Sequence, residues 1–297
     1  MSGTLTRRGF LASATTAVAA IAQTSTPEVI DLHQHTNYSG RSDEALVAHQ
    51  RKMGISKTIL LPAGARFGLA ADAGRNDSCV ELARKYPQEF YFFANEVPYY
   101  DEAIPTIEKY LKMGALGIGE QKFHIHADSR YIERLAGLAE EHNVPILMHF
   151  EHGAYNTGIE RFHRILAKFP RVNFIGHAQT WWGNIDLNHD PRDLYSKTRV
   201  TPGGISDRLL VDYSNIYGDL SAGSGNNSLM RDEEHARSFL TRHQDKLIYG
   251  SDCNDSAGYG EACIGARTLE ALRRLAPTPQ ILNKLLSGNA RKLLRIA

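Results

Sequence analysis

Two histidines, His33 and His35, end the apolar segment 29–35 (VIDLHQH) and are separated by a single residue. If this segment is a β-strand, alternate side chains point to the same face, so His33 and His35 project together. Ile30, Leu32 and Gln34 would project to the opposite face. Neutral imidazole is a common metal ligand, so a pair of imidazoles on one face predicts a metal site.

Four further side chains suit the same metal: Glu120, His149, His177 and Asp252. Imidazole and carboxylate ligands are typical of zinc, iron and manganese sites. Where one coordination position stays open, the metal lowers the pKa of bound water to about 7 and produces a nucleophile at neutral pH. Asp252 could then both ligate the metal and take the proton of that water.

From residue 23 onward, short β-branched or aromatic runs alternate with helical patterns, which is typical of repeated βα units. Eight strands are expected, at 29–35, 57–62, 90–97, 115–123, 145–151, 172–178, 216–222 and 246–252. Eight strands with intervening helices predict an α/β fold, a (β/α)8 TIM barrel that forms a single domain over 23–297. The competing doubly wound sheet would need a Gly-rich phosphate loop, and the sequence has none.

The barrel hypothesis demands that the chemistry lie at the C-terminal ends of the strands. The candidate ligands satisfy this demand at strands one, four, five, six and eight: His33, His35, Glu120, His149, His177 and Asp252. Glu120, His149 and His177 also follow one another at nearly equal intervals, as one βα unit per ligand requires. The pattern therefore favours one shared site over scattered core histidines.

Four segments carry a family resemblance: DLHQH in strand one, MHF in strand five, IGHAQ in strand six and YGSDCN in strand eight. Together they resemble the amidohydrolase superfamily, and within it the amidohydrolase-related (amidohydrolase 2) family of metal-dependent hydrolases and decarboxylases. The resemblance implies a divalent metal held by His33 and His35, joined by His149 or Glu120 and by Asp252. It implies that His177 ligates a second metal in a two-metal site or acts as an acid/base in a one-metal site.

The segment GIGEQKFHIH leaves the role of Glu120 open. The pleat of a strand would place Ile118, Glu120 and Lys122 on one face, toward the barrel axis. Glu120 could bridge two metals, as in the TatD-like deoxyribonucleases that GIGE resembles, or could hydrogen-bond a ligand instead. Lys122 is expected to bind a charged substrate group or to pair with Glu120.

A long loop, 178–204, is expected after strand six and carries the adjacent residues Trp181 and Trp182. Loops of this length usually serve a function or are disordered. Because this loop leaves the barrel just beyond His177, Trp181 and Trp182 are candidates for substrate binding. The alternative is that both tryptophans pack inward and anchor the loop.

Other titratable residues are expected to lie outside the metal site. The chain has three cysteines, Cys79, Cys253 and Cys263, an odd number without CxxC spacing, which indicates neither a disulfide framework nor a thiolate zinc site. Asp31 is expected to point inward beneath His33. The histidines on predicted helices are expected to face solvent: His49, His142, His163, His235 and His243.

The amino-acid composition limits the classes of binding partner to expect. With 34 basic and 33 acidic residues the net charge is +1, which gives no electrostatic reason to expect nucleic acid or an anionic membrane. A small-molecule substrate is expected. Neither the substrate nor the oligomeric state follows from the sequence.

The first 22 residues resemble a twin-arginine export signal. Arg7 and Arg8 precede a short apolar run that ends in Ala20-Ile21-Ala22, and the run is too short to span a bilayer. Cleavage after Ala22 by the export route would place a mature chain of 23–297 in the periplasm or otherwise outside the cytoplasm.

The function expected from these features is that of a metal-dependent hydrolase that uses metal-activated water on an ester, lactone or amide bond. A metal-dependent decarboxylase on the same barrel is the alternative, and a non-catalytic metal-binding protein is a third. A phosphoesterase of the histidinol-phosphatase type is disfavoured. Such enzymes end in the motif Asp-x-His, whereas Asp252 is followed by Cys253 and Asn254. Zinc is the expected metal, as one or two ions, with manganese or iron as alternatives.

Overall fold

The computed structural model describes Met1, residues 27–63 and residues 72–296. All eight expected strands are present, and the expected α/β barrel is confirmed. Their bounds are β1 Ile30–Gln34, β2 Lys57–Leu60, β3 Phe90–Phe92, β4 Ile118–Gln121, β5 Ile146–His149, β6 Phe174–His177, β7 Ile216–Asp219 and β8 Leu247–Ile248. The export signal predicted for residues 1–22 lies, apart from Met1, outside the described residues.

All strand pairs are parallel, in the order β1-β2-β3 and β4-β5-β6-β7-β8. Two sets of backbone hydrogen bonds join these sheets. Ala94, just after β3, accepts from Gly119 N and donates to Gly117 O, at 2.9 Å each. On the other side, Leu32 N donates to Tyr249 O at 3.1 Å, which links β1 to the segment after β8. Hydrogen bonding therefore continues around the barrel.

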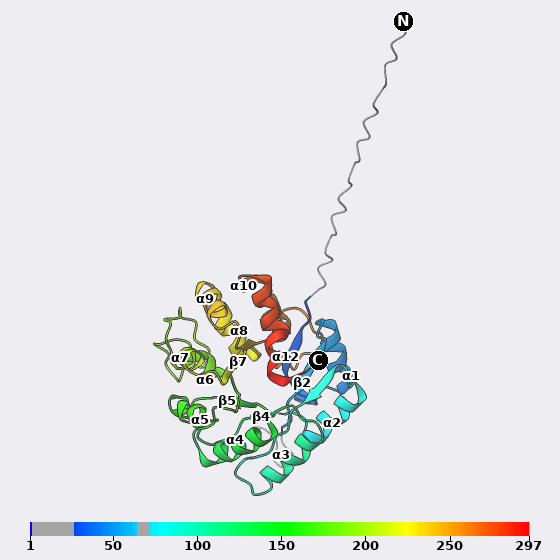
Figure 1. The fold of residues 1–297 in the computed structure, drawn as a ribbon, viewed down its shortest axis with the longest axis vertical. Coiled ribbons are helices and arrows are strands. Elements are labelled where there is room, and N and C mark those ends of the chain that lie inside the picture. The colour runs from blue at the N-terminus through cyan, green and yellow to red at the C-terminus, as the bar shows by residue number, and fades with distance from the viewer. Residues whose placement is uncertain (2–26, 64–71, 297) are drawn as a thin grey trace.

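The helices surround the strands in chain order (Figure 1). Their bounds are α1 Asp43–Lys52, α2 Asn76–Lys85, α3 Ala103–Lys112, α4 Arg130–His142, α5 His163–Lys168, α6 Gln179–Gly183, α7 Ile205–Asp212, α8 Ala222–Met230, α9 Glu233–Arg242, α10 Ile264–Leu275, α11 Pro279–Asn283 and α12 Asn289–Leu294. Short 3-10 turns occupy Tyr38–Gly40 and Ile159–Arg161, and a π-helical turn occupies Lys284–Gly288.

Local sequence explains several helix starts. Ser42 Oγ accepts a hydrogen bond from Ala45 N at the start of α1, and Asp43 and Glu44 follow in the first turn, where carboxylates favour the positive end of the helix. Thr278 caps α11 in the same way and is followed by Pro279, whose missing N–H costs nothing at that position.

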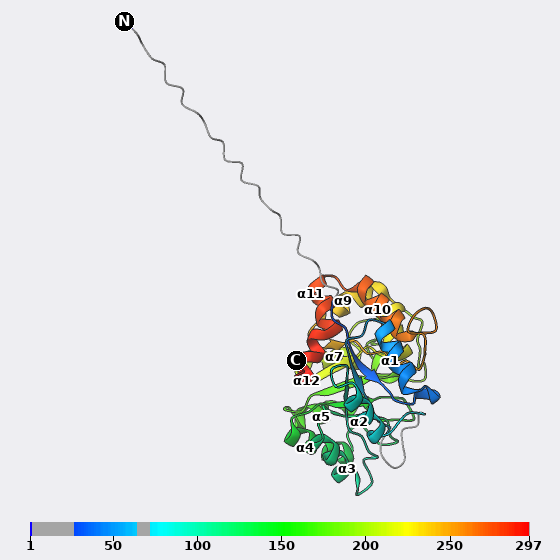
Figure 2. The same ribbon diagram turned by 90° about the vertical axis from the view of Figure 1, so that its right-hand side faces the viewer.

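The barrel interior is an apolar cluster beneath the strand ends. It contains residues of five strands and of the segments that follow β2 and β3: Ile30, Leu32, Ile59, Leu61, Phe93, Leu147, Ile175 and Ile248. Helix α12 adds Ala290, Leu293 and Leu294 to the same cluster. This helix lies across one end of the barrel (Figures 1 and 2). That end is therefore filled with side chains, and polar groups are concentrated toward the other end.

Strand β1 departs from a regular pleat. Asp31 pairs with Thr58 of β2 but Gln34 pairs with Leu60, so β1 has one residue more than β2 over this stretch. Such a bulge redirects the side chains that follow it and is common beside active sites.

The face assignment from simple alternation is therefore wrong for the first half of β1. Ile30 and Leu32 belong to the interior cluster, whereas alternation placed them opposite the histidines. Because of the bulge, His33 and His35 nevertheless meet above that cluster. Asp31 does not point inward as expected: its Oδ2 accepts from Gln50 of α1 at 2.8 Å, on the side that faces the helices.

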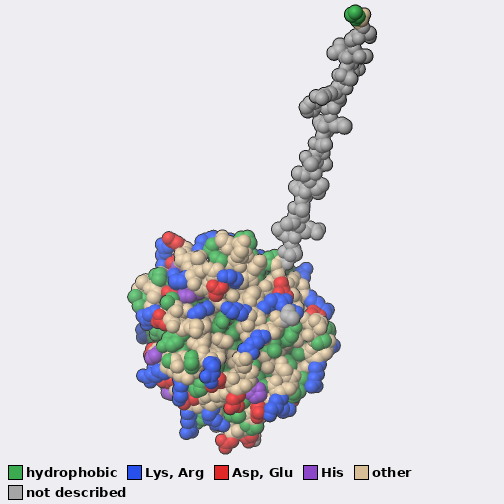
Figure 3. Space-filling model, viewed as in Figure 1, with side chains coloured by type: hydrophobic (Ala, Val, Ile, Leu, Met, Phe, Trp, Pro, Cys, Tyr) green, Lys and Arg blue, Asp and Glu red, His purple; other side chains and the backbone are tan. Residues whose placement is uncertain are grey.

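None of the helices in the described part of the chain is long and apolar enough to cross a membrane. Basic and acidic side chains are interspersed over the face seen in Figure 3.

Asp207 of α7 joins the segment after β6 to α9. Its carboxylate accepts from Gly203 N at 3.0 Å, from Arg242 at 3.0 Å and from His243 Nε2 at 2.7 Å. Burial raises the pKa of Asp207, but the hydrogen bonds from His243 and Arg242 outweigh it and lower that pKa to about 2.

We expect Asp207→Asn to lower the free energy of unfolding by about 2 kcal/mol at neutral pH, because charge-assisted hydrogen bonds are lost. A carboxylate with a lowered pKa in the folded state stabilises above its unfolded value of 3.8 and loses this contribution as the pH falls toward 2. Urea unfolding of both proteins should therefore give a difference that is constant above about pH 4 and shrinks below it. A difference that stays unchanged down to pH 2 would contradict the assignment.

Candidate metal centre

The imidazoles of His33 and His35 face each other with their Nε2 atoms 3.1 Å apart. His33 Nδ1–H donates to Asp219 Oδ2 at 2.7 Å, and His35 Nδ1–H donates to the backbone oxygen of Leu61 at 2.6 Å. With both Nδ1 protons used in this way, two Nε2 lone pairs point at one another. A cation between them, a proton or a metal ion, resolves that repulsion.

Two carboxylates approach these Nε2 atoms. Glu120 Oε2 lies 3.7 Å from Nε2 of both His33 and His35. Asp252 Oδ1 lies 3.9 Å from His33 Nε2 and 3.5 Å from His35 Nε2. Separations of this size between ligand atoms are those expected when each atom stands about 2 Å from a shared ion.

Asp252 also provides a direct test of whether a cation fits. Its side chain is 12% exposed, and Oδ1 has no hydrogen-bond partner among the described residues. A buried carboxylate oxygen without a partner is costly unless a cation or water satisfies it. The backbone of Asp252 has a positive φ of 43° and its N–H donates to His33 O at 2.8 Å, which turns the side chain toward the imidazoles. The donor set therefore fits a divalent metal.

His177 joins the group from the end of β6. Its Nε2 lies 3.8 Å from Glu120 Oε1 and 3.7 Å from Asp252 Oδ2. Its Nδ1 is held on the other side by Asp219 Oδ2 and Ser221 Oγ, each at 3.1 Å. His177 thus presents Nε2 to the same centre as His33 and His35.

Asp219 and Ser221 belong to the candidate centre and were not predicted from the sequence. Ser221 Oγ donates to Asp219 Oδ2 at 2.8 Å, and that oxygen also accepts from His33 and His177. Such carboxylates fix the tautomer and orientation of ligating imidazoles. The available signal was the position of Asp219 at the C-terminal end of β7, the same place that identified the other candidates.

The charges of the site perturb its pKa values. Burial lowers the pKa of His33, but the negative charges of Asp252 and Asp219 outweigh it and raise that pKa well above its usual value. Burial and the neighbouring His33 charge lower the pKa of His177. Burial raises the pKa of Asp219, yet His33 and His177 bring it down to about 2. The carboxylates thus favour positive charge at this point, as a metal ion would supply.

His149, the fourth candidate histidine, contacts the centre indirectly. Its Nδ1 hydrogen-bonds Glu120 Oε1, and its Nε2 lies 3.2 Å from Glu151 Oε2. The atoms that come within 4.8 Å of one another form two sets, His33 with His35 and Asp252, and His33 with Glu120 and His177. His149 belongs to neither set, so its role as a ligand stays a prediction.

Glu120 reaches the centre through an irregular turn of β4. Gly119 precedes it with φ 137°, and a Cβ there would lie 2.8 Å from the backbone oxygen of Leu147. Only glycine suits that position. Ile118 packs in a hydrophobic cluster that includes helix residues rather than in the barrel interior, so the regular pleat predicted for Ile118, Glu120 and Lys122 does not hold.

Two further side chains lie beside the centre. Tyr38, absent from the predicted site, follows β1, and the charge of Asp252, together with burial and the charge of Glu120, raises the pKa of its hydroxyl. It therefore stays protonated and can donate a hydrogen bond. Lys122 is half-buried, with Nζ over the ring of Tyr155 at 5.4 Å from its centroid. Its predicted role in substrate binding stays a prediction.

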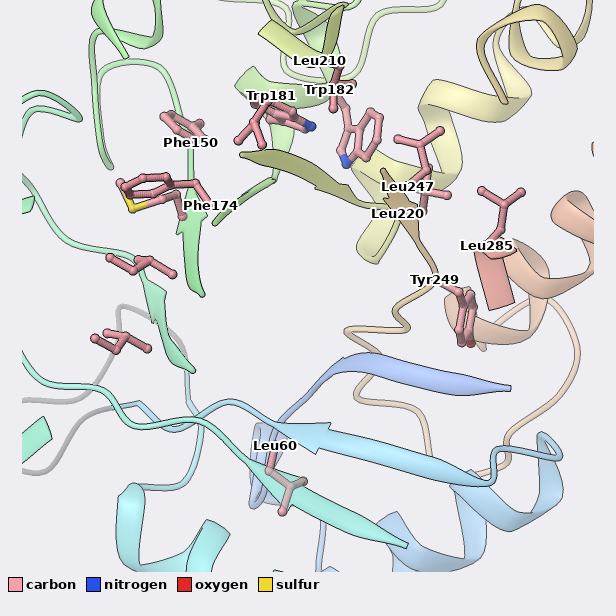
Figure 4. Close-up of a cluster of buried hydrophobic side chains, with 14 of the residues drawn as sticks. Leu60, Phe150, Phe174, Trp181, Trp182, Leu210, Leu220, Leu247, Tyr249 and Leu285 are labelled. Carbon is pink, nitrogen blue, oxygen red and sulfur yellow. The ribbon is translucent and has the colours of Figure 1, made fainter. Parts of the chain in front are cut away.

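Trp181 and Trp182 of α6 pack inward, as the alternative hypothesis for this loop states. Trp181 is fully buried and stacks on Phe150 at 5.9 Å, and Trp182 is 2% exposed with its Nε1 donating to Asp219 O at 2.9 Å (Figure 4). Both rings thus pack as the alternative states, and their role in substrate binding stays a prediction. Residues 184–204 then continue without helix or strand, as expected.

A cavity of about 280 Å³ lies next to the centre rather than in it. Its walls include Glu151, Asn156, Thr180 and His189. Glu151 is shared between this cavity and the centre, because its Oε2 contacts His149.

The expectation of solvent exposure is wrong for three of the helical histidines. His49, His235 and His243 are buried, at 0%, 7% and 3% exposure, whereas His163 is exposed as expected. His243 pairs with Asp207, which explains how a polar ring is accommodated.

A buried group of imidazoles and carboxylates at the C-terminal ends of the strands of an eight-stranded parallel α/β barrel defines the class of metal-site barrel enzymes. The family model described as amidohydrolase matches residues 30–296. The chain belongs to this amidohydrolase family. No curated protein matches the chain at a significant level.

Three solved structures illustrate the shared fold. An uncharacterised TIM-barrel protein of Bordetella bronchiseptica is 17% identical with a TM-score of 0.65, covering 90% of this chain and 98% of that chain. A probable 2-pyrone-4,6-dicarboxylic acid hydrolase of Acinetobacter baumannii is 11% identical with a TM-score of 0.63, covering 91% and 100%. A 5-carboxyvanillate decarboxylase of Novosphingobium aromaticivorans, complexed with manganese, is 15% identical with a TM-score of 0.58, covering 91% and 96%.

Proposed function

We propose that the chain is a metal-dependent hydrolase that cleaves an ester, lactone or amide bond of a small molecule. The observation that carries the proposal is the unpartnered Oδ1 of Asp252, which lies beside the Nε2 atoms of His33 and His35 and can take a proton from water. The cluster has the residue types of a water-activating site: a carboxylate base, a neutral imidazole and several ligands.

The residues that would hold the metal are His33, His35, Glu120, His177 and Asp252, which offer nitrogen and carboxylate oxygen donors. These donors suit zinc, and manganese or iron as alternatives. When bound, a divalent cation supplies a Lewis acid that polarises a substrate oxygen and lowers the pKa of water.

The protein's own groups then manage protons. Asp252 Oδ1 accepts the proton of the attacking water. Burial raises the pKa of Asp252, but His33 and His35 outweigh burial and lower that pKa, so the carboxylate stays ionised. In a one-metal site His177 stays free of the metal, and because its single proton lies on Nδ1 toward Asp219, its Nε2 can take the proton that Asp252 received and pass it to the leaving group. The Tyr38 hydroxyl can donate to an oxygen on which negative charge develops.

A metal-dependent decarboxylase is the second candidate. The observation that favours it is the set formed by His33, His35 and Asp252, whose ligand atoms lie within 4.8 Å of one another and suit one ion that binds a substrate carboxylate. The manganese-complexed 5-carboxyvanillate decarboxylase has the same fold. In that reaction the substrate loses carbon dioxide and gains a proton, and no oxygen from water enters the product.

Isotope labelling separates these reactions. The purified protein would be screened with esters, lactones, amides and hydroxybenzoates, and active substrates turned over in ¹⁸O-water. A hydrolase places one ¹⁸O atom in the acid product. Release of carbon dioxide with no ¹⁸O incorporation would replace the hydrolase proposal by the decarboxylase.

We also propose export by the twin-arginine route. The expected mature N-terminus lies near Gln23, outside the cytoplasm, because Ala20 and Ala22 provide the small residues before the cleavage point. N-terminal sequencing of the periplasmic fraction measures this. The double variant Arg7→Lys, Arg8→Lys should leave the unprocessed chain in the cytoplasm. Unchanged processing and location of that variant would overturn the export proposal.

A further inference from the structure

A second group of metal-binding side chains lies apart from the catalytic cluster, between α1 and the segment that follows β8. It contains His49, Cys253, Asp255 and Cys263, each with one ligand atom within 4.8 Å of the others. His49, Cys253 and Cys263 are at most 1% exposed, and Asp255 closes the solvent side. The spacing of the cysteines did not predict this group, because Cys253 and Cys263 are ten residues apart and His49 lies far away in the sequence, on α1.

The separations match those of a tetrahedral zinc site. The Sγ atoms of Cys253 and Cys263 lie 3.7 Å apart. Two zinc–sulfur bonds of about 2.3 Å at a tetrahedral angle require about 3.8 Å. His49 Nε2 lies 3.3 Å from Cys263 Sγ and 3.8 Å from Asp255 Oδ2, again close to the spacing of neighbouring ligands. A disulfide would require the two sulfur atoms at about 2.0 Å.

The groups behind His49 orient it as a ligand. Its Nδ1–H donates to Gln50 Oε1 at 2.9 Å, which leaves the Nε2 lone pair directed at the cysteines. Gln50 cannot rotate to offer its amide nitrogen there, because that nitrogen donates to Asp31 Oδ2 and Thr58 Oγ1, both at 2.8 Å. The imidazole is therefore fixed in the tautomer that metal binding requires.

Hydrogen bonds also position the two cysteines. Cys263 is the N-cap of α10 and its Sγ accepts from Ala266 N at 3.4 Å, so the positive end of this helix favours a thiolate. Arg41 donates to the backbone oxygens of Cys253 and Asp255 at 2.8 and 2.7 Å, which fixes the loop that carries both residues.

We propose that His49, Cys253, Asp255 and Cys263 bind a structural zinc ion. Imidazole, thiolate and carboxylate are all zinc ligands, and a closed set of four is the arrangement of structural zinc sites. The ion would tie α1 and α10 to the segment after β8. Because Cys253 directly follows Asp252, it would also fix the positive-φ backbone from which the Asp252 carboxylate reaches the catalytic cluster.

Cobalt substitution tests the proposal without interference from the catalytic cluster, whose candidate ligands include no sulfur. The whole purified protein would be stripped with a chelator and loaded with Co²⁺ under reducing conditions. We expect a near-ultraviolet thiolate-to-cobalt charge-transfer band at one ion per chain, displaced by one equivalent of Zn²⁺. A fully loaded protein without this band would overturn the proposal, and so would a Cys253–Cys263 disulfide found by mass spectrometry in protein purified without reductant.

Variants assign the band. Cys263→Ser and His49→Gln should each abolish or strongly weaken it and release one zinc ion per chain. Cys79→Ser removes the buried cysteine outside the group and should leave the band unchanged. If the first two variants fail to fold, sulfur at about 2.3 Å from zinc in X-ray absorption of the unaltered protein still decides the matter. A zinc environment of nitrogen and oxygen alone would count against it.

Discussion

Asp252→Asn is expected to lose turnover by a factor of about 10²–10⁴ while the protein stays folded and keeps part of its metal. Asparagine has nearly the shape of aspartate and can still offer an oxygen, but it cannot hold a proton from water. The effect is large because Oδ1 of Asp252 has no hydrogen-bond partner among the described residues that could take over that proton. Turnover and metal content should be measured on the same preparation.

Asp212→Asn is the matched control, because it removes an exposed carboxylate of α7 and should leave turnover unchanged. Circular dichroism of both variants checks the fold. Near-normal turnover in Asp252→Asn would remove Asp252 as the base. That result would not contradict the metal ligands proposed for the imidazole cluster or the zinc site proposed at Cys253, because metal content and spectroscopy test those proposals separately.

His33→Ala and His35→Ala are each expected to reduce the metal of the catalytic cluster from stoichiometric to a small fraction, and activity with it. Removing either imidazole opens a coordination position that no neighbouring side chain fills among the described residues. His33→Ala should have the larger effect on stability, because it also leaves Asp219 Oδ2 with one partner fewer in a fully buried place. Elemental analysis of the purified variants measures the loss.

His163→Ala is the control, since His163 is exposed and its Nδ1 hydrogen-bonds the backbone oxygen of Glu160, away from the cluster. The thiolate-to-cobalt band should be unchanged in all three variants, which shows that the missing ions come from the imidazole cluster. If His33→Ala or His35→Ala kept the metal of the imidazole cluster but lost the thiolate-to-cobalt band, the ligands assigned to the two sites would have to be exchanged. Full metal content with the band retained in both His33→Ala and His35→Ala would refute the metal centre.

His177→Asn distinguishes one catalytic ion from two. If His177 is an acid/base beside a single ion, its loss should reduce turnover by about 10²–10⁴ with metal content intact. If it ligates a second ion, one metal equivalent should leave with it.

Local sequence was enough to predict the eight strands, because the apolar runs, helical patterns and strand-end positions are local signals. It also identified the polar residues at the strand ends. His33, His35, Glu120, His177 and Asp252 come together because parallel strands in one barrel must present their C-terminal ends on one side. That argument needs only strand order and length.

Side-chain direction was less accessible to sequence. The bulge in β1 and the turn at Gly119 change which residues face inward, and both depend on pairing with a neighbouring strand. Trp181 and Trp182 fill space left by the glycines of β6 and β7, since a Cβ at Gly176 would lie 2.3 Å from the Trp181 ring. Packing of this kind involves residues distant in sequence and cannot be inferred from the loop alone.

The sequence by itself determined the barrel and the polar residues that meet at its strand ends, because their positions repeat with the βα unit. Only the tertiary structure brought Asp219 behind His33 and His177, and His49 beside Cys253 and Cys263. These contacts join residues whose separation follows no repeat: His49 lies on an early helix and the cysteines lie after the last strand. The physical reason is closure, since the last strand must return to the first and thereby places α1 against the loop after β8.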